Sequence, residues 1–109
     1  MQDGLALLHT AREWQSQGQG LWLIHVVRTW GSSPRPAGSL MLLAEDGRHM
    51  GSVSGGCVEG DLFQRLEAGD LSRDTPSLIE YSNEATPQVR LPCRSRLQLV
   101  VEPVLGSTD

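Results

Sequence analysis

Hydrophobic and polar positions follow a helical spacing in two parts of the chain. In the first part the apolar residues recur every three or four positions: Leu5, Leu8, Ala11 and Trp14. This spacing predicts an amphipathic helix, for which Asp3 is the candidate N-cap. Gly18 and Gly20 are expected to end it. In the second part Val58, Leu62 and Leu66 recur with Phe63, and Gly69 follows, which predicts a shorter amphipathic helix.

Five other segments are rich in β-branched or alternating apolar residues and are predicted to be strands. They are residues 21–29, 39–44, 48–54, 77–82 and 96–102. Asp46-Gly47 predicts a tight turn between the second and third strands, and Pro103 is expected to close the last one. Residues 30–38 and 83–95 are predicted loops. Two helices and five strands indicate a single α+β domain with a mixed or mostly antiparallel sheet, spanning residues 1–109.

Composition and charge narrow the function classes. The 109 residues carry a net charge of −4, with nine Arg and no Lys, which argues against a general nucleic-acid binder. The longest apolar run, residues 40–44, is too short to cross a membrane, and no signal peptide is visible, so we expect a cytoplasmic protein. The two cysteines stand alone and the three histidines are scattered, which argues against a disulfide framework or a zinc site.

The loop after the first predicted strand is one candidate site. Its polar and aromatic residues are Arg28, Trp30, Ser32, Ser33 and Arg35. The two arginines could flank an anion, the serines would add neutral donors, and Trp30 could stack on a planar ring. An ordinary surface loop, with Arg35 held by a carboxylate, explains the same residues equally well.

Two cysteines mark the other candidate sites. Gly55 and Gly56 precede Cys57 where a strand is predicted to run into a helix, a geometry that brings backbone amides close to an anion. The helix dipole would lower the pKa of the Cys57 thiol, but Glu59 and Asp61 oppose this effect. Composition alone therefore favours Cys57 as a small buried residue at a tight corner.

Cys93 lies beside Arg94 and Arg96, which favour a thiolate. The alternative is an ordinary loop cysteine.

Three motifs resemble the N-terminal domain of the XdhC/CoxI family. They are residues 26–36 (VVRTWGSSPRP) with 38–41 (GSLM), residues 46–48 (DGR) with 51–59 (GSVSGGCVE), and Pro92-Cys93 with 101–103 (VEP). The resemblance extends from the first helix to Pro103. It implies an accessory or chaperone protein that binds the molybdenum cofactor, a molybdopterin or its dinucleotide, without retaining it tightly. Such proteins assist sulfuration of the cofactor or its insertion into molybdenum hydroxylases such as xanthine dehydrogenase, and are not turnover enzymes.

The resemblance also implies roles for the candidate residues. Arg28, Arg35, Ser32 and Ser33 would supply anion donors, and Trp30 an aromatic surface. Gly55 and Gly56 would allow a close approach of the backbone. Cys57 or Cys93 would lie near molybdenum, since soft thiolates suit this metal. The implied partners are the large subunit of a molybdenum hydroxylase and a cysteine desulfurase, and a homodimer would cover apolar surface left by the lean core.

Two departures from the family pattern keep alternatives open. Family members usually continue into a Rossmann-type C-terminal domain, which is absent from these 109 residues. The second cysteine is usually followed by two glycines, whereas Arg94 and Ser95 follow Cys93 here. These departures favour a scaffold or regulatory module that no longer carries cofactor. A cysteine-dependent enzyme is a further alternative, although no base stands at a suitable spacing.

Overall fold

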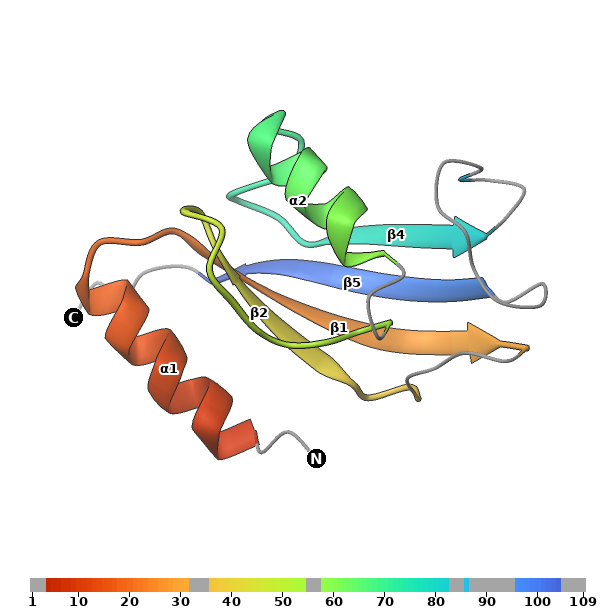
Figure 1. Cartoon of the computed structure of the whole chain (residues 1–109), viewed down its shortest axis with the longest axis horizontal. Helices are drawn as coiled ribbons and strands as arrows, with labels where there is room; N and C mark the ends of the chain where they lie inside the picture. The colour runs from red at the N-terminus through yellow and green to blue at the C-terminus, as the bar shows by residue number, and fades with distance from the viewer. Residues whose placement is uncertain (1–3, 32–35, 55–57, 83–85, 87–95, 105–109) are drawn as a thin grey trace.

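The computed structural model describes residues 4–31, 36–54, 58–82, 86 and 96–104. Within them, two helices and a five-stranded antiparallel sheet form one α+β globule, as the sequence predicts (Figure 1). The helices are α1 (Gly4–Ser16) and α2 (Glu59–Glu67). The strands are β1 (Leu21–Trp30), β2 (Leu40–Ala44), β3 (His49–Gly51), β4 (Ser77–Ser82) and β5 (Arg96–Val104). Their order across the sheet is β3-β2-β1-β5-β4.

The main core lies between the sheet and α2. Trp22, Ile24 and Val26 of β1 point to this side, beside Leu97 and Leu99 of β5. The Trp22 indole is nearly fully buried and donates a hydrogen bond of 2.8 Å to the Ser72 carbonyl oxygen. The ring thus contributes apolar burial while its only polar group is satisfied.

The opposite face of the sheet is covered only in part. Leu7 of α1 packs on Leu21, Leu42 and Ala44, next to the start of β1. Leu78 of β4, on the part of this face away from α1, is 63% exposed. Figure 1 shows α1 lying to one side of the sheet, so β4 and β5 have no helix on this face among the described residues.

Two strand boundaries differ from the sequence prediction by more than one residue. The third strand ends at Gly51 instead of residue 54, because the next residues bind a side chain of α2. The last strand continues through Pro103, where the sequence predicts its end. Pairing with β4 ends at Val101, so Pro103 has a neighbouring strand on one side only, where a missing N–H is tolerated.

None of the helices described is long and apolar enough to cross a membrane. The candidate cap Asp3 lies outside the described residues, and α1 ends at Ser16, just before Gly18, which has φ +83°.

Candidate functional site

Several chain segments of interest join the sheet at the same end. Trp30 of β1 is in register with Arg96 of β5, which is in turn in register with Ser82 of β4. At this end β3 finishes at Gly51, opposite Met41 near the start of β2. We call this the loop end of the sheet. All three candidate segments from the sequence adjoin it.

A β-bulge at Val27 decides where Arg28 and Trp30 point. Val26 pairs with Leu99, but the next pair is Arg28 with Gln98, so Val27 has no partner on β5. Strict alternation would place residues 28 and 30 on the core side with Val26. The extra residue reverses the faces, and Arg28 and Trp30 therefore lie on the face opposite α2.

Trp30 brings two arginines together. The Arg28 guanidinium carbon lies 4.8 Å from the centroid of the indole ring, and that of Arg96 lies 4.2 Å from it. Both distances are within the range of a cation–π contact. In this arrangement Trp30 is a platform for two cations, so a planar ligand would have to displace a guanidinium to stack on the ring.

The two arginines differ in their other partners. Arg96 donates to the Glu80 carboxylate at 2.8 Å through Nη2, and Gln98 donates to the other oxygen of Glu80 at 3.1 Å. These hydrogen bonds lower the pKa of Glu80, and the bond from Gln98 has the larger effect. Arg28 forms no ion pair with any carboxylate of the described residues. Of the two arginines that the structure describes at this end, Arg28 therefore has its charge available to an anionic ligand.

On the other face, Glu59 anchors the backbone that leads to the double glycine. Its carboxylate accepts hydrogen bonds from Ser52 Oγ at 2.6 Å, Val53 N–H at 3.0 Å and Ser54 N–H at 3.2 Å. The Ser54 hydroxyl also donates to the Glu59 carboxylate, and it accepts a bond of 2.8 Å from the Val58 N–H. Ser54 and Val58 flank residues 55–57, so one carboxylate and one hydroxyl bind both flanks of that segment. We call this set of contacts the Glu59 clamp.

The clamp keeps Glu59 ionised although the residue is only 8% exposed. Burial opposes ionisation, but the hydrogen bonds from Ser52, Ser54 and Val53 outweigh it and lower the pKa of Glu59 to about 2. The sequence alone suggests that Glu59 opposes a thiolate at the helix N-terminus. In the structure the donors of residues 52–54 hold this negative charge at the start of α2, so that objection stands.

A second contact network ties the first turn of α2 to β4. The Tyr81 hydroxyl donates to Asp61 Oδ2 at 2.5 Å, and Arg65 Nε donates to the same oxygen at 2.8 Å. Burial raises the pKa of Tyr81, and its bond to the Asp61 carboxylate raises it further. Tyr81 therefore stays protonated and acts as a structural donor that fixes α2 above the sheet.

The structure thus places two of the nine predicted site residues, Arg28 and Trp30, and brings them together. The other seven lie outside the described residues: Ser32, Ser33, Arg35, Gly55, Gly56, Cys57 and Cys93. The described flanks of the Cys57 segment lie on the α2 side of the sheet, whereas Arg28 and Trp30 lie on the other side. Arg28 and Trp30 therefore lie at the same end of the sheet as Ser54 and Val58, the flanks of the Cys57 segment, but on the opposite face.

The sequence alone does not assign Arg96 and Glu59 to the site. It marks Arg96 only as a neighbour of Cys93, because the position of Arg96 beside Trp30 depends on the pairing of β1 with β5. It treats Glu59 only as a charge at a helix end. The signal for its role is local: two serines, at 52 and 54, precede a glutamate in the first turn of a predicted helix.

Comparisons with known proteins identify the family of this chain. Residues 14–82 match the model of the XdhC and CoxI family. The chain is 37% identical over 102 residues to the molybdenum cofactor insertion chaperone PaoD of Escherichia coli, covering 91% of this chain and 31% of PaoD. It is 52% identical over 52 residues to a probable xanthine dehydrogenase subunit of Bacillus subtilis, covering 47% of this chain and 15% of that protein.

A solved structure shares the fold. The crystal structure of a xanthine dehydrogenase from Bacillus halodurans superposes with a TM-score of 0.66 and 24% identity, covering 89% of this chain and 30% of that one. The chain thus spans less than a third of the length of each of these three proteins. The family model, however, covers more than half of the chain, from the end of α1 through β4. The chain belongs to the XdhC and CoxI family.

Proposed function

We propose that this chain takes part in the maturation of a molybdenum hydroxylase such as xanthine dehydrogenase. In this proposal it binds the molybdenum cofactor as cargo and assists sulfuration or insertion of the cofactor into the enzyme. Family membership and the 37% identity to an insertion chaperone support the maturation role. We also assign the chain to the N-terminal domain of longer family members and place its work in the cytoplasm.

The observation that carries cofactor binding is the pair of arginines on Trp30. A molybdopterin carries a phosphate, and a phosphate is recognised by charge-assisted hydrogen bonds from guanidinium groups. Arg28 has no carboxylate partner in the part of the chain that the structure describes, and Arg96 lies on the same ring. Ser32, Ser33 and Arg35, which follow Trp30 in sequence, are the proposed further donors.

The Glu59 clamp supports a second part of the proposal. It fixes Ser54 and Val58, the residues on either side of Gly55, Gly56 and Cys57. We propose that these glycines let the backbone approach the cofactor and that Cys57 or Cys93 supplies a thiolate near molybdenum. The clamp would hold Ser54 and Val58 in position on either side of this segment when the cofactor binds.

The proposed partners follow from the same role. They are the large subunit of a molybdenum hydroxylase and a cysteine desulfurase that would donate sulfur. A second copy of the chain is a third proposed partner, since Leu5 and Leu8 of α1 are about 60% exposed.

Retention of the cofactor by the purified chain tests the proposal. Cofactor released from a donor molybdoenzyme is mixed with the chain, and protein-bound molybdenum and pterin are measured after ultrafiltration. We expect one cofactor per chain, and about a tenfold weaker affinity for Arg28→Ala, in line with loss of a charged hydrogen bond. Cys57→Ala and Cys93→Ala identify the thiol, because only one of them should lose molybdenum.

The matched control is Arg12→Ala, which removes an exposed arginine of α1 far from the loop end. It should bind cofactor like the unmodified chain. A folded chain that retains no cofactor would contradict cofactor binding and favour the scaffold alternative. Retention that is the same in all four variants would contradict the site.

A further inference from the structure

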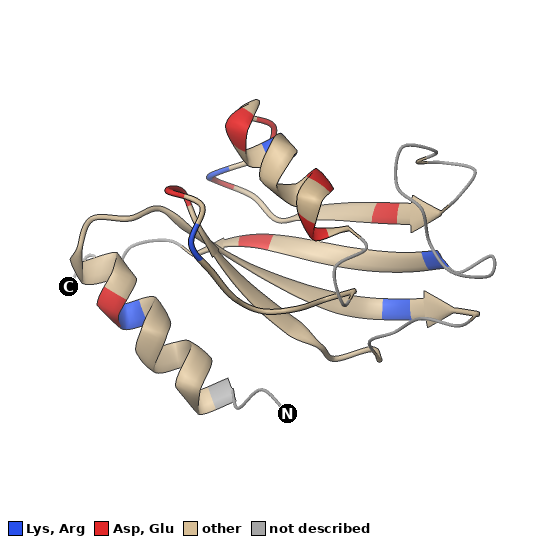
Figure 2. Cartoon of the chain, viewed as in Figure 1, with Lys and Arg blue, Asp and Glu red and all other residues tan. Residues whose placement is uncertain are grey.

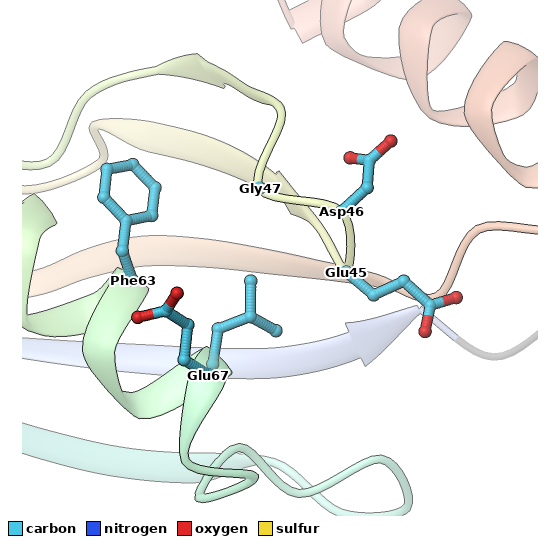
Figure 3. Close-up of a pocket in the computed structure, with 6 residues that line it drawn as sticks. Glu45, Asp46, Gly47, Phe63 and Glu67 are labelled. Atoms are coloured by element: carbon cyan, nitrogen blue, oxygen red, sulfur yellow. The ribbon is translucent and has the colours of Figure 1, made fainter.

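A pocket lies at the end of the sheet opposite Trp30. It has a volume of about 460 Å³ and lies between the β2–β3 turn and the last turn of α2 (Figure 3). Its lining residues are Glu45, Asp46, Gly47, Phe63, Leu66 and Glu67. Because Ala44 at the end of β2 pairs with Leu21 at the start of β1, this pocket and Trp30 are separated by the length of β1. We call this the turn end of the sheet.

The pocket combines apolar and acidic groups. Phe63 and Leu66 are half-buried side chains that pack against the main core, and they give the α2 side of the pocket an apolar surface. In Figure 3 the Glu67 carboxylate lies on the same side of α2 as the Phe63 ring, while those of Glu45 and Asp46 point away from the helix. An apolar surface beside one carboxylate suits a ligand with an apolar stem and a cationic head.

The three carboxylates differ in their partners. Glu45 accepts hydrogen bonds from Gly20 N–H at 2.7 Å and from Arg73 at 3.2 Å. Asp46 accepts from Arg48 Nε at 2.9 Å. The Glu67 carboxylate has no hydrogen bond or ion pair with any residue of the described segments. Among these residues, two of the three charges are therefore compensated and that of Glu67 is not.

Its position in α2 makes the charge of Glu67 unfavourable in the free chain. Glu67 is the last residue of the helix, where the backbone carbonyls give a negative partial charge. A cation beside it would be attracted both by the carboxylate and by the helix end. Within the described segments no three potential ligands come together to hold a metal ion, which favours an organic cation.

We propose that this pocket receives an arginine side chain of a partner protein. The arginine stem packs on Phe63 and Leu66, and its guanidinium pairs with Glu67. The Phe63 ring already has the His49 ring as a neighbour, with 5.1 Å between the two centroids. One ion pair and a small apolar contact give weak binding, so the arginine belongs to a larger contact formed by the partner around the pocket.

This inference goes beyond the proposed function and does not depend on it. A partner that docks at the turn end leaves the arginines at the loop end uncovered. The chain could then hold cargo at one end while it is bound to a protein at the other.

A titration of the full chain followed by NMR tests the pocket. The probe is a capped Gly-Arg-Gly peptide, and its counterpart has citrulline, which keeps the shape of arginine but lacks the charge. With the arginine peptide we expect saturable shifts of the backbone amides of Gly47, Leu66 and Glu67. The citrulline peptide should bind about threefold more weakly, as expected for loss of one exposed ion pair.

Glu67→Gln should weaken binding of the arginine peptide by about threefold, because it removes the uncompensated charge and keeps the shape. The matched control is Glu13→Gln, which removes an exposed charge from α1 and should change nothing. Equal binding of the two peptides, no saturable shift, or unchanged binding by Glu67→Gln would overturn the proposal. Shifts of the same amides by magnesium chloride, without any by the arginine peptide, would assign a metal ion and overturn it as well.

Discussion

The two ends of the sheet are built in different ways. At the loop end, Trp30, Arg96 and Glu80 come from three strands far apart in sequence, and Glu59 reaches back to residues 52–54. At the turn end, Arg48 donates to Asp46, two residues before it, around Gly47. Figure 2 shows basic residues on β1 and β5 near the loop end, and acidic residues near the β2–β3 turn and along α2. Both ends have contacts between distant segments, since Glu45 at the turn end binds Gly20 and Arg73. Those of the turn end are exposed, whereas the Glu59 clamp at the loop end is buried.

This difference decides what each end can contribute to stability. The Glu59 clamp is buried, so water cannot reach its polar groups in the folded chain. Each group therefore depends on its partner in the clamp for a hydrogen bond. The Arg48–Asp46 pair is exposed, and exposed ion pairs contribute little. Substitutions at the loop end should therefore cost more free energy of unfolding than matched substitutions at the turn end.

Glu59→Ala should have the largest effect. It leaves the N–H groups of Val53 and Ser54 without their acceptor, which costs about 3 to 4 kcal/mol of unfolding free energy. Urea denaturation measures this loss. The matched control is Glu67→Ala at the other end of the same helix, which should change stability by less than about 0.5 kcal/mol. Similar losses for the two variants would contradict the contrast between the ends.

The same clamp predicts a loss of stability in acid. The pKa of Glu59 is about 2 in the folded chain, below its ordinary value of 4.5. Since the folded pKa is depressed, the contribution is complete above about pH 4.5 and is lost as the pH falls towards 2. It amounts to about 2 to 3 kcal/mol.

Urea denaturation between pH 6 and pH 2 compares the unmodified chain with Glu59→Gln, which cannot ionise. The loss in acid should be smaller for the variant by that amount. Parallel pH curves for the two chains would show that Glu59 is not held as the structure describes.

The sequence predicts the elements because their signals are local. The helical spacing before Gly18 and the Asp46-Gly47 turn each lie within a few residues, and both are confirmed. The bulge at Val27 is not predicted, because it follows from how β1 pairs with β5. For the same reason the sequence places Trp30 beside an incoming ligand, whereas the structure places it under two arginines.

The third strand shows how a tertiary contact overrides a local preference. Residues 48–54 have the composition of one strand, but Ser52 and Ser54 bind the Glu59 carboxylate and leave the sheet. A side chain seven positions away from Ser52 thus ends the strand. Of the nine predicted site residues, the structure describes Arg28 and Trp30, and their role in binding stays a prediction. The sequence does not identify the contacts that hold them.

Two matched glycine substitutions give the smallest effects and test the turn end directly. Gly47 has φ +95°, so Gly47→Ala should cost about 1 kcal/mol of unfolding free energy even though a Cβ there would meet no atom within 4 Å. Gly60 lies inside α2, where a Cβ also has open space. Gly60→Ala should therefore stabilise the chain by about 0.5 to 1 kcal/mol, because alanine loses less backbone entropy in a helix.

Thermal unfolding of the two variants measures both values, and the expected result is opposite signs for the same chemical change. A loss in both would mean that space around α2 is tighter than the structure describes. A gain in both would mean that the turn adopts a backbone conformation open to alanine. Only opposite signs agree with a left-handed backbone at Gly47 and a helical backbone with open space at Gly60.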